Sequence, residues 1–181
     1  MCGIVSYIGH QDPVPILIKG LRRLEYRGYD SAGLALLDGK NLNSVKKAGK
    51  VSDLSDKVSS KSIQGTCGIA HTRWATHGVP NDTNAHPHLD KTGKIALVHN
   101  GIIENYDSIK KTLEGREVVF KSETDSEVLV QLISELYFKS EGDLDFKDAV
   151  KAALQEVVGA YGIVAICSDE PNTLVAARMG S

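Results

Sequence analysis

Cysteine, proline and tryptophan are scarce in this sequence of 181 residues, which has three Cys, five Pro and one Trp. The cysteines stand at positions 2, 67 and 167. Their odd number and wide spacing argue against a disulfide framework and against a zinc site. No apolar run approaches the roughly 20 residues of a membrane-spanning helix, and the first residues lack the basic stretch and apolar core of a signal peptide. We therefore expect reduced thiols and a cytoplasmic protein.

The sequence also has no large excess of charge of one sign, because 21 Lys and Arg residues nearly balance 23 Asp and Glu residues. A net charge of -2 gives no field that would favour nucleic acid or an anionic membrane. There is no repeat, no low-complexity segment and no visible linker, and the length suits one globular domain. Nothing in the sequence calls for a metal ion or another cofactor, and none is expected.

Hydrophobic patterns predict strands and helices in alternation. Residues 3–9 alternate like a strand, and Asp12 with Pro13 marks the start of a helix that should stop at Gly28. Ser122 with Asp125 resembles a capping box, and the apolar residues that follow it mark one face of a further helix. The other strands are expected at residues 32–37, 44–47, 68–73, 95–99, 162–167 and 173–178, and the other helices at 51–59, 106–113 and 146–158. This order predicts an α+β fold with sheets packed between helices.

Cys2 directly follows the initiator methionine, and a side chain this small normally permits removal of Met1. The exposed cysteine would then carry a thiol and an α-amine, which titrate near ~8.5 and ~7.7–8. A neutral amine can take the thiol proton without a separate histidine. The sequence therefore allows an N-terminal nucleophile, although a small second residue also occurs by chance.

Other polar motifs each admit a functional and a structural interpretation. Residues 71–78, which run off a strand into a loop, hold a guanidinium, an indole and two imidazoles, and Arg73 is suited to bind a carboxylate with two hydrogen bonds. The histidines of residues 84–88 support a loop more readily than a metal, because no third ligand has a recognisable spacing. Asn100 and Gly101 suit an oxyanion site or a simple turn. Residues 27–33 contain two glycines that suit a turn or a close approach of the backbone.

Taken together, the motifs resemble the glutaminase domain of the glutamine–fructose-6-phosphate aminotransferases, within the class II glutamine amidotransferases. The resemblance runs through the whole chain and rests on residues 1–5, 22–33, 71–78, 84–88, 99–105 and 122–125. It implies a four-layer αββα sandwich of the N-terminal nucleophile hydrolase type, with no cofactor. L-glutamine is the implied substrate.

The resemblance also implies a role for each motif residue. Cys2 attacks the carboxamide of glutamine to form a γ-glutamyl thioester, and Asn100 and Gly101 donate hydrogen bonds to the oxyanion. Arg73, with Thr76 and His77 of the same loop, binds the substrate α-carboxylate. Asp125 binds the α-ammonium group. Trp74 lies in the loop that closes over glutamine, with support from His86 and Arg27.

In the resembling enzymes the glutaminase domain continues for several dozen residues past a point like Ser181, and a sugar-isomerising region follows. We therefore expect residues 2–181 to be a truncated glutaminase domain, incomplete at its C-terminus. The full-length parent is expected to pass ammonia to fructose 6-phosphate, forming glucosamine 6-phosphate, as a homodimer. Two alternatives remain open: a glutaminase that serves another acceptor, and a non-catalytic module that only binds glutamine.

Overall fold

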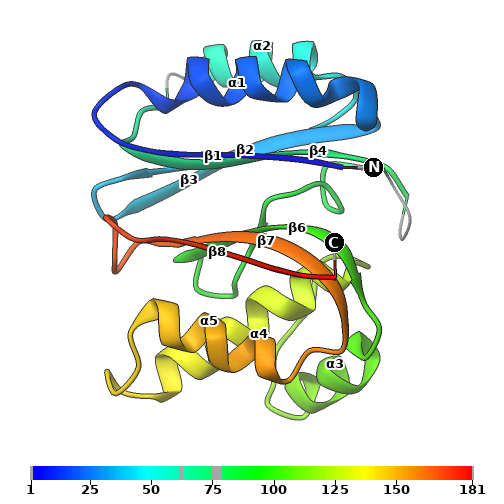
Figure 1. Cartoon of the computed structure of the whole chain (residues 1–181), viewed down its shortest axis with the longest axis vertical. Helices are drawn as coiled ribbons and strands as arrows, with labels where there is room; N and C mark the ends of the chain where they lie inside the picture. Colours follow the sequence, from blue (N-terminus) through cyan, green and yellow to red (C-terminus); the bar gives the residue numbers. More distant parts are fainter. Residues whose placement is uncertain (1, 62, 75–78, 181) are drawn as a thin grey trace.

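Two antiparallel sheets stacked face to face form the centre of the molecule, and helices cover the outer face of each sheet (Figure 1). The computed structural model describes residues 2–61, 63–74 and 79–180. The first sheet has the spatial order β1 (Gly3–Ile8), β4 (Cys67–Arg73), β2 (Ser31–Asp38) and β3 (Asn41–Ala48). The second has the order β5 (His88–Leu89), β6 (Ile95–Ile103), β7 (Gly159–Cys167) and β8 (Leu174–Met179).

The helices form the two outer layers (Figure 1). The first sheet is covered by α1 (Pro13–Leu24) and α2 (Val51–Lys61), and a short 3-10 turn, η1 (Glu25–Arg27), follows α1. The second sheet is covered by α4 (Asp125–Lys139) and α5 (Phe146–Gln155), and α3 (Tyr106–Glu114) packs beside α4. The arrangement confirms the predicted four-layer αββα sandwich. None of the helices in the described part of the chain is long and apolar enough to cross a membrane.

Most predicted elements are present, because their apolar residues face one of three buried layers. Helix α1 begins as predicted, since the Asp12 side chain accepts a hydrogen bond from the Val14 N–H at 3.0 Å and Pro13 occupies the first turn. Its apolar face, with Leu17 and Leu21 fully buried, packs on the first sheet.

Several features differ from the sequence expectation. The capping box at Ser122 is wrong: Thr124 caps α4 by accepting from the Glu127 N–H at 3.3 Å, and Ser122 donates to the Glu127 carboxylate instead. Strand β6 continues past His99 to Ile103, because β7 starts at Gly159 and pairs with it along its whole length. Asn100 and Gly101 therefore lie within a strand and do not form a turn. The two-residue strand β5 was not predicted.

The layer between the sheets is apolar at one end and polar at the other. Alternate residues of β4 and β6 face this layer. At the apolar end it is filled by Ala35, Leu37, Cys67, Ile69, Ala96, Val98, Val164 and Ile166. Further along the same faces stand His71 and Arg73 on β4 and Asn100 on β6. We call the first group the apolar end and His71, Arg73, Asn100, His86 and His88 the polar end.

Candidate active site

Cys2 lies at the polar end because β1 begins immediately after it. The register pairs Gly3 with Thr72 and Ile4 with His71, so the thiol is held beside the end of β4. The Trp74 backbone N–H donates a hydrogen bond to the Cys2 sulfur over 3.2 Å. Burial raises the pKa of the Cys2 thiol, although the hydrogen bond from Trp74 acts in the opposite direction. The thiol is therefore protonated at neutral pH, and a base has to remove its proton before it can attack.

Asn100 connects the two sheets at this point. Its side-chain N–H donates to the Cys2 carbonyl oxygen over 3.3 Å, and its amide oxygen lies 2.8 Å from Nε2 of His71. His71 is fully buried, and burial lowers its pKa to about 4. The imidazole is therefore neutral, and a hydrogen-bonded chain runs from β4 through Asn100 to the main chain of Cys2.

Gly101 borders the cavity next to Cys2 in a conformation that other residues avoid. Its φ is +125°, and a Cβ at this position would collide with the carbonyl oxygen of Ala160 on β7. Only glycine allows β6 to pair with β7 here and still expose its backbone to the cavity. A similar close approach occurs at Gly33, where a Cβ would collide with the carbonyl oxygen of His86. This confirms the backbone role expected for one of the two glycines in residues 27–33.

Asp125 faces the same cavity from the first turn of α4. Its carboxylate accepts from the Ile103 N–H over 2.9 Å and from the Ser126 hydroxyl over 3.3 Å. The ring of His99 lies 3.9 Å from the carboxylate and 2.9 Å from the Ser126 hydroxyl. The positive end of the helix dipole stabilises a negative charge at this position. The contacts hold the carboxylate in place and leave it able to bind a cationic group.

The cavity brings together residues from β1, β4, β6 and α4. It is lined by Cys2, Arg73, Trp74, His86, His99, Gly101, Thr124, Asp125 and Ser126. Arg73 is only 4% exposed, so its guanidinium is a buried positive charge in the same wall as the thiol. Asn100 is not among the lining residues, but its side chain contacts the main chain of Cys2. Thr76 and His77, which the motif also indicates, lie outside the described residues.

Trp74 and Arg27 lie at the margin of the site. The Trp74 side chain is 47% exposed and packs edge-to-face against Tyr29, with ring centroids 5.5 Å apart. Such a contact leaves the indole accessible from the cavity and from solvent. Arg27 is half-buried in η1 and is not among the residues that line the cavity.

The two histidines of residues 84–88 are buried, and His86 lines the cavity. The His86 ring lies 4.2 Å from that of His71 and 4.7 Å from that of His88, between centroids. Burial lowers the pKa of His86 and of His88 well below the ordinary value. No group of three His, Cys, Asp or Glu side chains in residues 2–61, 63–74 and 79–180 is arranged to hold a metal ion.

The sequence of the chain identifies its family. The profile of the glutamine amidotransferase domain matches residues 52–145, which is more than half of the chain. The chain belongs to the glutamine amidotransferase domain family. Two of the most similar curated relatives are the glutamine–fructose-6-phosphate aminotransferases (isomerizing) of Bacteroides thetaiotaomicron and Chlorobaculum tepidum, with 57% and 54% identity over the whole chain. The chain spans 29% and 30% of the length of these two relatives.

Solved structures of amidotransferases share the fold. The glutamine phosphoribosylpyrophosphate amidotransferase of B. subtilis, solved with ADP and GMP, superposes with a TM-score of 0.80 and 27% identity. This similarity covers 98% of the present chain and 37% of the other. A class II glutamine amidotransferase domain protein from Silicibacter pomeroyi, with a TM-score of 0.56 and 17% identity, shares the fold alone. The predicted N-terminal nucleophile hydrolase type is thus confirmed for this amidotransferase domain.

No individual role was predicted from the sequence for four residues that shape the amidotransferase site: His71, His99, Thr124 and Ser126. His71 and Arg73 are two positions apart on β4 and therefore face the same side, which was the one available signal. Thr124 and Ser126 border the cavity because they flank Asp125 where α4 begins. The contact of His99 with Ser126 joins two segments that no local pattern relates.

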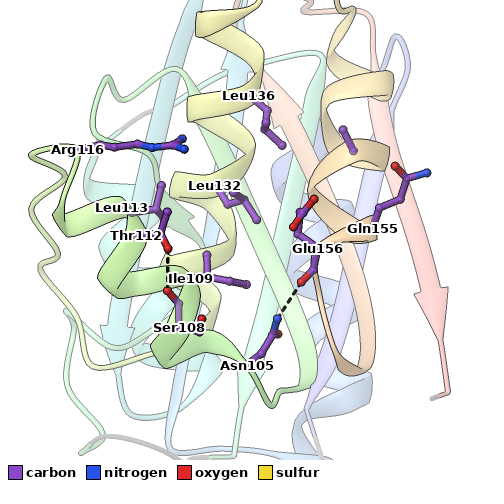
Figure 2. A pocket seen from close by; sticks show the side chains of 11 residues that line it. Asn105, Ser108, Ile109, Thr112, Leu113, Arg116, Leu132, Leu136, Gln155 and Glu156 are labelled. Carbon is purple, nitrogen blue, oxygen red and sulfur yellow. Dashed lines mark hydrogen bonds between the residues drawn. The ribbon is translucent and has the colours of Figure 1, made fainter.

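A second cavity, of about 440 Å³, lies between α3, α4 and the end of α5 (Figure 2). Its base is apolar, with Ile109, Leu132 and Leu136 pointing into it from α3 and α4. Asn105 closes one end by donating to the Glu156 carbonyl oxygen over 2.8 Å. It shares no lining residue with the cavity at Cys2, and nothing in the structure indicates what would occupy it.

Proposed function

We propose that this amidotransferase domain hydrolyses L-glutamine to glutamate and ammonia, with Cys2 as the nucleophile. One observation carries the proposal: the Cys2 thiol shares a small cavity with one buried cation, Arg73, and one anion, Asp125. A zwitterionic amino acid has a carboxylate and an ammonium group that these two charges match. An uncharged carboxamide could then extend toward the sulfur.

In the proposed complex the backbone of glutamine is held by charge. The α-carboxylate binds Arg73, and the α-ammonium binds Asp125, whose carboxylate is already oriented by Ile103. Thr76 and His77 remain proposed partners of the carboxylate because of the motif they belong to. Closure of the loop around Trp74 would exclude water from the bound substrate. His86 and Arg27 are proposed to support that loop.

The proposed chemistry starts after Met1 has been removed. The α-amine of Cys2 takes the thiol proton, and the sulfur attacks the carboxamide carbon of glutamine. Asn100 and the Gly101 N–H donate hydrogen bonds to the oxyanion of the tetrahedral intermediate. The amine then gives its proton to the departing nitrogen, so ammonia leaves and a γ-glutamyl thioester remains. Water hydrolyses the thioester, which releases glutamate and restores the thiol.

The further use of the ammonia is also a proposal. Relatives at 50–57% identity are named glutamine–fructose-6-phosphate aminotransferases, which favours fructose 6-phosphate over other acceptors. We propose residues 2–181 as one glutaminase domain, with the sugar-isomerase region outside the chain and a homodimer as the full-length form. The cytoplasm remains the proposed location, since all three cysteines are unpaired thiols.

The decisive experiment measures ammonia and glutamate released from glutamine by the purified chain after intact mass has confirmed loss of Met1. Cys2→Ala is expected to abolish release and to retain glutamine binding, because Arg73 and Asp125 are unchanged. A diazoketone analogue of glutamine should add once to the wild type and not to the variant.

Three outcomes are informative here. Release that persists in Cys2→Ala would refute the nucleophile. A folded wild-type chain that binds glutamine without releasing ammonia would favour the non-catalytic alternative. Ammonia release that does not increase when fructose 6-phosphate is added would leave the proposed glutaminase activity unaffected. It would mean that the present chain does not respond to the sugar, and that any use of the sugar needs the additional length of the relatives.

A further inference from the structure

His71 and Asn100 face one another across the layer between the two sheets. His71 stands on β4, two residues before Arg73, and Asn100 stands on β6. The Nε2 atom of His71 lies 2.8 Å from the amide oxygen of Asn100, which is hydrogen-bonding distance. His71 is not among the residues that line the cavity, and its contact with Asn100 links it to the main chain of Cys2.

The contacts of Asn100 determine which way its amide faces. The Cys2 carbonyl oxygen, 3.3 Å from Asn100, can only accept a hydrogen bond, so the NH2 group must face it. The amide oxygen must then face His71, and Nε2 of His71 must carry the hydrogen. Because burial lowers the pKa of His71 to about 4, the ring is neutral and has only one N–H. Its Nδ1 has no hydrogen-bond partner among the described residues.

An amide NH2 group has two hydrogens, and the Cys2 carbonyl uses one. The second is the donor that the proposed reaction assigns to the oxyanion. If the amide were rotated by half a turn, its oxygen would face the developing negative charge and would repel it. A donor on the opposite side of Asn100 prevents this rotation, and His71 is the residue in that position.

We propose that His71 is a positioning residue, which holds the Asn100 amide with its NH2 group toward Cys2 and the substrate oxyanion. The inference rests on the proposed glutaminase function and deepens it. The ring neither touches glutamine nor transfers a proton. Its contribution is realised in the transition state, because only there does the carboxamide oxygen carry a full negative charge.

The test compares His71→Phe, which keeps a ring without a donor, with His71→Gln, whose amide N–H can replace Nε2. For His71→Phe we expect kcat for glutamine to fall by about 10- to 100-fold with KM unchanged, less than the loss of an oxyanion donor itself. His71→Gln should restore kcat to within a few-fold of wild type. Alkylation of Cys2 by iodoacetamide, a displacement without an oxyanion, should keep its wild-type rate in both variants.

Other outcomes would overturn the positioning role. Loss of alkylation in parallel with kcat would mean that His71→Phe has damaged the nucleophile or the fold. A KM effect alone, or a His71→Gln variant as slow as His71→Phe, would also contradict the proposal.

A second measurement does not depend on turnover. The ¹⁵N shifts of the His71 ring in the wild-type protein should show the Nε2–H tautomer. The Nδ1–H tautomer in a protein that hydrolyses glutamine would refute the positioning role alone. The Nε2–H tautomer in a protein without ammonia release would refute the proposed function and retain the Asn100 geometry.

Discussion

The apolar end and the polar end of the layer between the sheets are built from the same strand faces. On β4, Cys67 and Ile69 belong to the apolar end and His71 and Arg73 to the polar end. Strand β6 changes in the same way between Val98 and Asn100. On each strand the inward-facing side chains therefore change from apolar to polar between two successive residues of the same face.

This difference shows how a stable sandwich accommodates buried polar groups. Burial of apolar side chains at one end stabilises the two sheets against each other. At the other end, the buried groups depend on specific partners such as the contact between His71 and Asn100. We therefore expect the polar end to be the sensitive part of the domain, and the following changes test that expectation.

Acid should produce the largest loss of stability, and it should act at the polar end. Burial lowers the pKa of His71 to about 4 and those of His86 and His88 well below the ordinary value. Below about pH 6.5 the unfolded chain therefore binds protons that the folded chain does not. Each neutral ring should lower the free energy of unfolding by about 1.4 kcal/mol for every pH unit below 6.5. For His71 this loss continues until the pH reaches about 4, the pKa of the ring in the folded protein. Urea unfolding at pH 7.5, 6.0 and 5.0 measures this slope.

The variant His71→Phe provides the control for the acid experiment, because it removes one of the titrating rings. Its stability should fall less steeply between pH 6.5 and 5.0 than that of the wild type. An unchanged slope in this variant, or a wild-type stability that is flat over this range, would show that the histidines are protonated in the folded protein.

The second change, Gly101→Ala, introduces a side chain at a backbone position that admits only glycine. The positive φ and the collision with the Ala160 carbonyl oxygen should cost at least about 3 kcal/mol of unfolding free energy and most of the activity. Gly162→Ala on the neighbouring strand is the matched control, since a Cβ there has no atom within 4 Å. Thermal unfolding measures the stability of both variants. Equal stability of Gly101→Ala and Gly162→Ala would contradict the strain assigned to position 101.

The smallest effect is expected at the apolar end. Ile69→Val removes one methylene group from a fully buried side chain and should cost about 1 kcal/mol of unfolding free energy. The loss should be the same at pH 7.5 and 5.0, and kcat per folded molecule should not change. A kinetic effect of this variant would show that the two ends are coupled.

Local patterns predicted most elements because each has an apolar face that a short window of sequence reveals. They failed at α4, where Ser122 with Asp125 and Thr124 with Glu127 both satisfy the capping pattern and only the folded chain distinguishes them. They failed at β6 because Asn-Gly favours a turn locally, whereas pairing with β7 keeps Gly101 within the strand. The family resemblance supplied the motif residues, and the arrangement of Cys2, Arg73, Gly101 and Asp125 around one cavity became visible only in the structure.

The contacts between distant segments had no local signal. His71, His86, His88 and Asn100 come from β4, a loop, β5 and β6, and no window of the sequence contains them all. Strand β5 has only two residues, which is too short for periodicity to be recognised. What determines these positions is the pairing of strands across long sequence separations.

Strand β1 starts at Gly3, so no spacer separates Cys2, the proposed nucleophile, from the hydrogen-bonded ladder with β4. The alternation of side chains along β1 therefore determines which face of the sheet the Cys2 thiol points to. One extra residue inserted between Cys2 and Gly3 would turn the sulfur toward the helical layer, and two would return it to the correct face about 7 Å too far along. A tag fused ahead of Cys2 would turn its amine into an amide, so protein engineering of this domain has to be confined to the other terminus.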